Sequence, residues 1–392
     1  MDTSTFPRQA FASYITYRHP LTHTHEKITK DKKVKVAYFG GSVTAGFGST
    51  NSSLYSWRAR SEQWFAAQFP DVQWDFLFSA IGANGTFLGT YRVQRDVIAL
   101  KPDLLFIEYA INDKYGAFSK ERAAWQCETI VREVRQALPH TDIVILLVID
   151  ESTSKLLPDL YPTAAGHAEI AAAYDIPVVN VGRSLVESMQ DPNDPDEWHR
   201  YYIDIVHPTD AGYAKYFECL EEYLDNALLH TDFSSLTDEA KPLPALQSDH
   251  LMDGDRKIVP AAEMTPYIVA DGTHGYVFDA DTRFLNLPKT PYIGSYTAAA
   301  EQTDAQITLR FTGTDLSLFT NFYSDSTILY AVDGGEFTEL RCDRNGPTRL
   351  LEDAAAGEHT VVIRPLSYGE STKGVMQIGA LLMRDATKQT TR

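Results

Sequence analysis

Two contrasting hydrophobic patterns divide this chain, and they constrain its fold more than any other feature. Between about Lys33 and Leu229, short apolar runs alternate with longer amphipathic stretches. From about Pro266 onward, short segments of alternating apolar and polar residues are separated by turn residues. The first pattern is typical of a parallel sheet covered by helices, and the second of an all-β domain. The sequence therefore predicts an α/β domain followed by a β-domain.

The predicted elements of the first part alternate along the chain. Strands are expected at 34–39, 74–78, 104–109, 143–149 and 178–179, and helices at 56–69, 120–137 and 164–174. This order predicts a three-layer domain with a parallel sheet, in which ligands bind beyond the carboxyl ends of the strands. Residues 231–264 are rich in Ser, Asp and Pro and are expected to form a connector. The predicted domains are therefore 1–230 and 265–392.

The second part has the pattern of a β-sandwich. Apolar and polar residues alternate over 305–311, and Asp333-Gly334 is typical of a hairpin turn. Further strand-like segments are 315–319, 327–332 and 359–363. The segments together predict an antiparallel sandwich of the jelly-roll kind.

Composition restricts the class of protein and its partners. With 44% hydrophobic and 22% charged residues over 392 positions, the chain has the composition of a globular protein of about two domains. It contains no apolar run of about 20 residues and does not begin with a basic and then apolar leader, so a cytoplasmic location is expected. A signal peptide removed beforehand is the alternative. The net charge of −18 opposes nucleic acid and anionic membrane as partners and leaves a neutral or cationic substrate, with the oligomeric state open.

Two separate motifs carry candidate catalytic residues. The predicted strand 34–39 runs into Gly40-Gly41-Ser42, which places a serine where a helical turn begins. Far downstream, Asp204 lies three residues before His207. A histidine can take the proton of a serine hydroxyl, and a carboxylate on its other ring nitrogen fixes its tautomer. Taken singly, Ser42 is equally explained as a turn or helix cap, and the Asp204/His207 pair as a loop cap beside a surface residue.

Two further loops can supply hydrogen-bond donors. The apolar strand 104–109 leads to Asn112-Asp113, where an asparagine amide can donate to an oxyanion or simply form a turn. The loop that follows strand 74–78 is rich in small residues and can offer backbone N–H groups. Glu108, inside its apolar strand, is expected to have a buried hydrogen-bond partner instead of a catalytic role.

In this order, the four blocks resemble those of the SGNH, or GDSL-like, hydrolases over roughly residues 33–225. The resemblance implies that Ser42 is the nucleophile and that Asp204 and His207 complete a catalytic triad. It also implies that Asn112 and a glycine-loop residue join the Ser42 N–H as an oxyanion hole.

Two departures from the family pattern concern that oxyanion hole. Ala110 stands where the family usually has glycine in its third block. The glycine loop aligns in more than one way, so its donor is Gly82, Ala83 or Gly85, with Gly82 preferred.

The two-domain organisation is similar to that of carbohydrate acetylesterases within this family. That resemblance implies removal of acetyl groups from xylan- or mannan-type oligosaccharides through an acyl-enzyme, without a cofactor. A lipid or other acyl-ester hydrolase and a catalytically inactive glycan-binding protein are the alternatives. In the β-domain, aromatic residues would stack on sugar rings if exposed and otherwise belong to the core, namely Tyr292, Tyr296 and Phe322.

The N-terminal arm contains several potential metal ligands. His19, His23 and His25 lie close together, with Glu26 as the nearby acidic residue. A complete ligand set is not evident from this spacing. The sequence therefore predicts a packed or solvated arm and no metal site.

Overall fold

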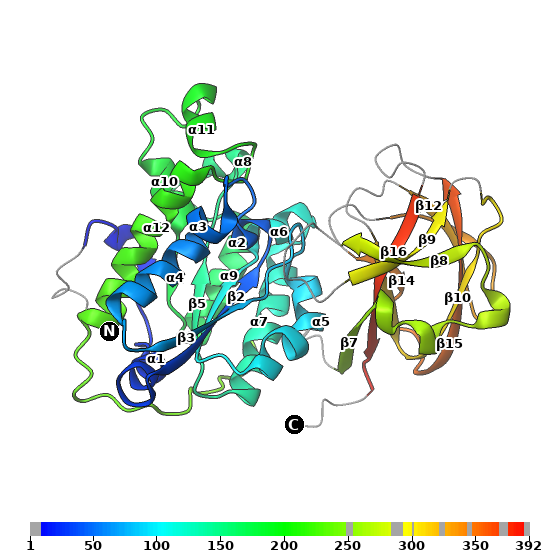
Figure 1. Ribbon diagram of the computed structural model, residues 1–392, viewed down its shortest axis with the longest axis horizontal. Coiled ribbons are helices and arrows are strands. Elements are labelled where there is room, and N and C mark those ends of the chain that lie inside the picture. The colour runs from blue at the N-terminus through cyan, green and yellow to red at the C-terminus, as the bar shows by residue number, and fades with distance from the viewer. Residues whose placement is uncertain are drawn as a thin grey trace. The chain divides into compact units, whose positions relative to one another are not determined.

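The chain folds into two compact units. The structure, a computed structural model, describes residues 9–247, 254–283, 293–299, 302–320, 326–342, 347–367 and 375–387 (Figure 1). One unit comprises Met1–Gly89 and Val93–Leu251, and the other comprises Thr90–Arg92 and Met252–Arg392.

A six-stranded sheet in the order β1-β6-β5-β4-β2-β3 forms the centre of the N-terminal unit. Its strands are β1 (Ile15–Thr16), β2 (Lys33–Gly40), β3 (Gln73–Phe78), β4 (Leu104–Glu108), β5 (Asp142–Leu146) and β6 (Val178–Val179). The strands from β2 to β6 are parallel to their neighbours, whereas β1 runs antiparallel to β6. The predicted α/β sheet is confirmed. The edge strand β1 was not predicted, because two residues are too few to show a hydrophobic period.

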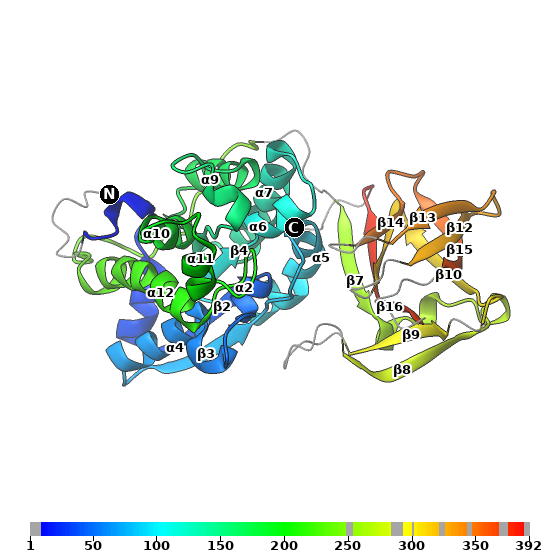
Figure 2. The same cartoon turned by 90° about the horizontal axis from the view of Figure 1, so that it is seen from above.

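Helices cover both faces of this sheet (Figure 2). Helix α12 packs against α4 and α10 in one layer, while α9 packs against α6 and α7 in the other. The helices are α1 (Thr22–Glu26), α2 (Ser42–Ala45), α3 (Ser52–Tyr55), α4 (Trp57–Gln68), α5 (Thr86–Asp96), α6 (Ala110–Tyr115), α7 (Lys120–Ala137), α8 (Glu151–Ser154), α9 (Pro162–Ala173), α10 (Val181–Glu187), α11 (Pro195–Tyr201) and α12 (Asp210–Leu224). Among the described residues, no helix has both the length and the apolar character needed to cross a bilayer.

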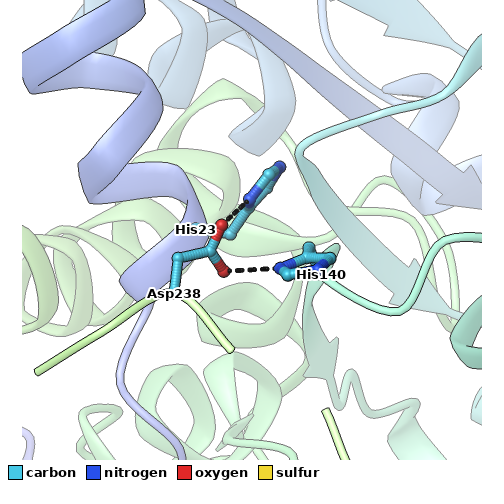
Figure 3. A group of neighbouring side chains, drawn as sticks. All are labelled: His23, His140 and Asp238. Carbon is cyan, nitrogen blue, oxygen red and sulfur yellow. Dashed lines mark hydrogen bonds and ion pairs between the residues drawn. The ribbon is translucent and has the colours of Figure 1, made fainter. Parts of the chain in front are cut away.

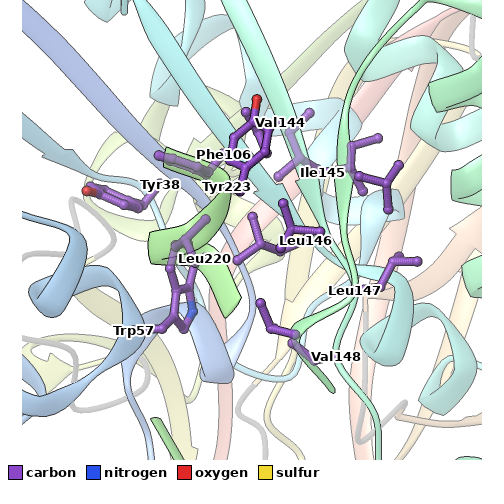
Figure 4. Packing of buried hydrophobic residues seen from close by; sticks show 14 of the residues in the cluster. Tyr38, Trp57, Phe106, Val144, Ile145, Leu146, Leu147, Val148, Leu220 and Tyr223 are labelled. Atoms are coloured by element: carbon purple, nitrogen blue, oxygen red, sulfur yellow. The ribbon is translucent and has the colours of Figure 1, made fainter. Parts of the chain in front are cut away.

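The central strands are apolar on both faces because helices bury both sides of the sheet. Tyr38 of β2 stacks on Phe106 of β4 with ring centroids 5.5 Å apart, and Trp57 of α4 meets Phe106 edge-on at 5.8 Å (Figure 4). All three side chains are almost completely buried. This packing holds β2 and β4 firmly, so the residues at their ends are well positioned.

Strand β2 lies between β3 and β4 in the sheet. The chain therefore leaves β2 toward one neighbour and returns on its other side, which creates a switch point at the carboxyl end of β2. Open α/β sheets bind ligands at such points. The residues that follow β2, β3 and β4 meet there.

The C-terminal unit consists of two antiparallel sheets, which confirms the predicted β-domain. Four strands form one sheet, namely β10 (Ile307–Gly313), β15 (Gly357–Ser367), β12 (Thr327–Val332) and β13 (Thr338–Arg341). Six form the other, namely β14 (Thr348–Leu351), β11 (Asp315–Thr320), β16 (Val375–Asp385), β9 (Ile293–Ala299), β8 (Tyr276–Arg283) and β7 (Asp255–Pro260). Apolar residues of both sheets share one core, as in a sandwich.

The predicted hairpin and aromatic residues of this unit have different outcomes. Asp333 and Gly334 both have positive φ, of 52° and 76°, and begin the connection, residues 333–337, between the antiparallel strands β12 and β13, so the predicted hairpin is present. Tyr296 packs against the core of the unit. Tyr292 and Phe322 lie outside the described residues.

The segment 231–264, expected to be a connector, contains two different structures. Its first part packs on the N-terminal unit, where the buried Lys241 Nζ lies 3.0 Å from Asp142 Oδ1. Its last part contains β7, which pairs antiparallel with β16. Because that partner lies more than a hundred residues away, local composition indicated a loop while non-local pairing formed a strand.

Candidate functional site

Ser42 lies directly beyond the carboxyl end of β2. The strand ends at Gly40, Gly41 is the N-cap, and Ser42 is the first residue of α2. A Cβ on Gly41 would lie 2.1 Å from Asn112 Oδ1, so only glycine fits between this turn and that side chain. The Gly-Gly-Ser sequence thus lets the chain turn sharply and places the serine at the switch point of the sheet.

The structure brings Ser42, Asp204 and His207 together although Ser42 and His207 are 165 positions apart in the chain. Ser42 Oγ lies 2.8 Å from His207 Nε2. His207 Nδ1 lies 2.7 Å from Asp204 Oδ2. The arrangement therefore provides a hydroxyl, a base within hydrogen-bond distance and a carboxylate on the far side of that base.

The loop of Asp204 fixes this carboxylate relative to the imidazole. Its Oδ1 accepts hydrogen bonds from the backbone N–H groups of Val206 and His207, both at 2.8 Å. The Trp198 Nε1–H donates to the Asp204 carbonyl oxygen at 2.9 Å. Partial burial raises the pKa of the Asp204 carboxyl, but the hydrogen bonds from His207 and Val206 lower it to about 2 on balance. Asp204 is therefore ionised near neutral pH, as the orientation of a histidine requires.

The glycine loop after β3 lies against Ser42. A Cβ on Gly82 would be 3.3 Å from Ser42 Cβ, so Gly82 faces the serine with little room for a side chain. A Cβ on Gly85 would instead lie 2.1 Å from Asp113 Oδ1. The Asn112 amide is buried next to Gly41, and its Oδ1 has no hydrogen-bond partner. Gly82 and Asn112 thus both approach the turn that carries Ser42.

Asp113 and His167 form a buried anchor for the glycine loop. Asp113 Oδ1 accepts from the Thr86 N–H at 2.7 Å, and its Oδ2 accepts from the Thr86 hydroxyl at 2.9 Å. His167 Nε2, from α9, lies 2.8 Å from Asp113 Oδ2. Burial lowers the pKa of His167, but Cys127 and Asp113 raise it to about 10 on balance. Sequence reasoning missed His167, since a histidine in an alanine-rich helix gives no local signal of its partner.

Glu108 lies beneath the Ser42 turn. Its Oε2 accepts a hydrogen bond from the Thr44 hydroxyl at 2.8 Å, and its Oε1 is buried without a partner. Burial raises the pKa of the Glu108 carboxyl to about 7, although hydrogen bonds from Thr44 and Gly41 partly oppose this. The buried partner expected for Glu108 is therefore Thr44, the second residue after Ser42.

Apolar side chains are exposed around His207. Phe47 meets the His207 ring edge-on, with centroids 4.5 Å apart, and is 54% exposed. Ile203 and Ile205, from the loop of Asp204, are about half exposed. Exposed apolar groups beside a candidate site are typical of a surface that contacts a ligand.

Comparison with protein families matches residues 38–215 to the sequence model of the GDSL-like Lipase/Acylhydrolase family. The match spans Ser42, Gly82, Asn112, Asp204 and His207. A comparison with curated protein sequences finds no match.

Among solved structures, the chain is similar to a two-domain esterase, CEX, that is active on acetylated mannans. The TM-score is 0.77 with 19% sequence identity, over 97% of this chain and 99% of that one. A structure of an esterase of that name co-crystallised with mannopentaose gives a TM-score of 0.74 with 18% identity, over 96% and 98% of the two chains. An acetylxylan esterase from Geobacillus stearothermophilus matches 50% of this chain and 94% of its own, with 18% identity and a TM-score of 0.41.

Proposed function

Because residues 38–215 match the sequence model of the GDSL-like Lipase/Acylhydrolase family, we propose that this protein is a serine esterase that removes acetyl groups from carbohydrates. One observation carries the proposal. The His207 imidazole lies between the other two groups, with its Nε2 2.8 Å from Ser42 Oγ and its Nδ1 2.7 Å from Asp204 Oδ2. This arrangement activates a serine for attack on an ester carbonyl.

In the first step, His207 Nε2 takes the proton of Ser42 as Oγ attacks the acetyl carbonyl carbon. Asp204 accepts the hydrogen bond from His207 Nδ1–H and stabilises the imidazolium that forms. The imidazolium then gives its proton to the sugar oxygen, which leaves as the alcohol. The acetyl group remains on Ser42 as an ester.

The negative charge on the carbonyl oxygen needs donors beside Ser42. We assign this role to the backbone N–H groups of Ser42 and Gly82 and to the Asn112 side-chain amide. Gly82 is favoured over Gly85 because it faces Ser42, whereas Gly85 faces Asp113, and Ala83 remains an alternative. An amide donor of this kind contributes about 3–4 kcal/mol to stabilising the transition state.

In the second step, water repeats the attack on the acetyl-serine ester. His207 accepts a proton from the water and returns it to Ser42 Oγ, so acetate is released and the enzyme is restored. This cycle uses only the described side chains and needs no cofactor.

The substrate class follows from the two-domain likeness and from charge. The solved structure that matches nearly the whole chain is an esterase active on acetylated mannans. An acetylated mannan oligosaccharide is therefore the preferred substrate, with an acetylated xylan oligosaccharide next. Both are compatible with a chain of net charge −18, because neither carries the phosphates that such a charge would repel.

A second candidate function is hydrolysis of a longer acyl ester. The exposed Phe47, Ile203 and Ile205 beside His207 favour it, since they could hold an acyl chain as well as the apolar face of a sugar. The two candidate functions differ in the length of the acyl group that is released, so parallel assays with acetyl esters and long-chain esters distinguish them.

The test is acetate release from acetylated mannan and xylan oligosaccharides by the parent, Ser42→Ala and Ser49→Ala. Ser49 is the matched control, because its hydroxyl donates to the Gly46 carbonyl in the same loop without contacting His207. A long-chain acyl ester is assayed in parallel. We expect acetate release by the parent and Ser49→Ala, and a loss of at least about 1,000-fold in Ser42→Ala.

Each other outcome contradicts part of the proposal. Activity confined to the long-chain ester would favour the lipid acylhydrolase. Absence of hydrolysis by the parent, with oligosaccharide binding retained, would favour a glycan-binding protein. Equal acetate release by Ser42→Ala would exclude Ser42 as the nucleophile.

A further inference from the structure

Three potential metal ligands from distant parts of the chain converge in the N-terminal unit. His23 belongs to α1, His140 precedes β5, and Asp238 belongs to the segment that follows α12. Asp238 Oδ2 lies 2.6 Å from His23 Nδ1, and its Oδ1 lies 3.1 Å from His140 Nδ1. Figure 3 shows this carboxylate between the two imidazole rings. One atom from each of the three residues lies within 4.8 Å of the others.

A fourth residue, Asp103, fixes the orientation of His23. Its Oδ1 lies 3.1 Å from His23 Nε2, and its Oδ2 accepts the backbone N–H of Lys35 at 2.8 Å. Histidines that bind metal usually donate their second ring N–H to a carboxylate, which sets the tautomer and turns the other nitrogen to the ion. Asp103 thus holds Nδ1 of His23 toward Asp238 and His140.

Acidic and basic side chains both surround the cluster. Asp103, Asp142 and Asp238 lie around it, and Lys241 Nζ lies 3.0 Å from Asp142 but 3.8 Å from Asp238. Lys27 interacts electrostatically with Asp103 and Asp238, and Arg135 with Asp142. The carboxylates nearest the two imidazoles are therefore Asp103 and Asp238, which contact His23 directly.

Access from solvent is also available. The side chains of His23 and Asp238 are 14% and 13% exposed, whereas that of His140 is 44% exposed. An ion and a bound water can therefore enter beside His140, while the other two ligands stay sheltered from bulk solvent.

We propose that His23 Nδ1, His140 Nδ1 and the Asp238 carboxylate bind a divalent transition-metal ion of the Zn²⁺ type, with water as the fourth ligand. Two imidazoles and one carboxylate form a donor set that suits zinc. Tetrahedral bonds of about 2.1 Å place ligand atoms about 3.4 Å apart. The present contacts of 2.6 and 3.1 Å, made by the two different oxygens of Asp238, must widen slightly, and the longest separation, which is within 4.8 Å, must narrow by at most about 1.4 Å.

This site is structural and separate from the proposed esterase chemistry. His140 and Asp103 lie at the starts of β5 and β4, whereas Ser42 follows the end of β2. In a parallel sheet, the starts of the strands and the ends of the strands lie on opposite sides of the domain. The ion would join the segment around Asp238 to α1 and to the sheet, and would stabilise the fold without contacting the acyl ester.

The experiment titrates Zn²⁺ into the full chain after EDTA treatment and dialysis, by isothermal calorimetry, with metal content measured by mass spectrometry. The variants are His140→Gln and Asp238→Asn. The matched control is His25→Gln, because His25 lies on α1 but stacks on Phe233, with ring centroids 3.6 Å apart. We expect one Zn²⁺ per chain in the parent and control, and affinity at least tenfold weaker in both ligand variants.

A second measurement separates binding from folding. Zn²⁺ should raise the melting temperature of the parent and of His25→Gln but not of His140→Gln, because binding to the native state alone stabilises it. His140→Gln decides the matter if Asp238→Asn fails to fold, since His140 is the most exposed of the three ligands. Absence of saturable binding in the parent, or equal affinity in His140→Gln, would show that the cluster is only a hydrogen-bonded network.

Discussion

The buried Glu108 gives the N-terminal unit a pH-dependent stability that can be calculated from the structure. Its pKa is raised from 4.5 to about 7 by burial, and the unfolded chain retains the ordinary value. Between these two values the folded state holds a proton that the unfolded state has lost. Stability therefore falls as the pH rises through this window and is level above it. Raising the pKa of Glu108 from 4.5 to about 7 corresponds to about 3 kcal/mol of stability.

The perturbation is Glu108→Gln, which keeps the shape of the side chain and the acceptor for the Thr44 hydroxyl but cannot ionise. We expect the free energy of unfolding of the variant, relative to the parent, to increase by about 3 kcal/mol from pH 4.5 to pH 8. Contributions from other carboxylates cancel in this difference, because both proteins contain them. Asp204 does not affect the difference, because its lowered pKa changes stability only below the pH range of the experiment.

The assay is denaturant unfolding at several pH values, followed by tryptophan fluorescence. All five tryptophans, at positions 57, 64, 74, 125 and 198, belong to the N-terminal unit, so the signal reports that unit alone. Thr44→Val is the matched variant. It removes a hydrogen bond that favours the ionised carboxyl, so the fall in stability should extend above pH 7. A stability difference between parent and Glu108→Gln that does not change with pH would refute the reasoning.

Two predictions concern the proposed reaction and are checked by steady-state kinetics on the acetylated substrate. In Asp204→Asn, the amide oxygen keeps the two backbone N–H bonds and the NH₂ group faces His207 Nδ1, which forces the proton onto Nε2. We expect kcat to fall about 10⁴-fold with KM nearly unchanged, whereas the control Asp210→Asn, which faces Thr50, stays active. In Asn112→Ala, kcat should fall about 100- to 1,000-fold. A rise in KM with an unchanged kcat would contradict the assignment of Asn112 to the oxyanion hole.

The parts of the fold that could be predicted are those with a strong local signal. The buried strands β2, β4 and β5 are short, mostly apolar segments that alternate with predicted helices, so their existence and parallel direction could be predicted, whereas their order in the sheet could not. Strand β7 could not be predicted, because its partner β16 lies more than a hundred residues later. The segment around Asp238 could not be placed either, since its packing depends on an ion pair between Lys241 and Asp142.

The candidate site residues also differ in whether a local sequence motif predicts them. Ser42, Asn112, Asp204 and His207 each lie in a local motif. In the structure, His207 lies within hydrogen-bond distance of Ser42 and Asp204, and Asn112 lies against Gly41. His140 and Asp238 have no motif in common with His23, which is 117 and 215 residues away in sequence. A sequence pattern predicts ligands that are neighbours in the chain, and so it indicated an incomplete set in the N-terminal arm.

One short stretch, from the end of β4 at Glu108 to Asp113, contacts three parts of the candidate site. Glu108 supports the Ser42 turn through Thr44, Asn112 lies against Gly41, and Asp113 holds the glycine loop through Thr86. Three successive loops of the switch point are thus tied to one strand end, which is itself held by a core buried on both faces. A displacement of this strand end would move the Ser42 turn, the Asn112 amide and the glycine loop together, so their mutual distances would be preserved. A site that must place charge-stabilising donors within tenths of an ångström gains its precision from such common anchoring.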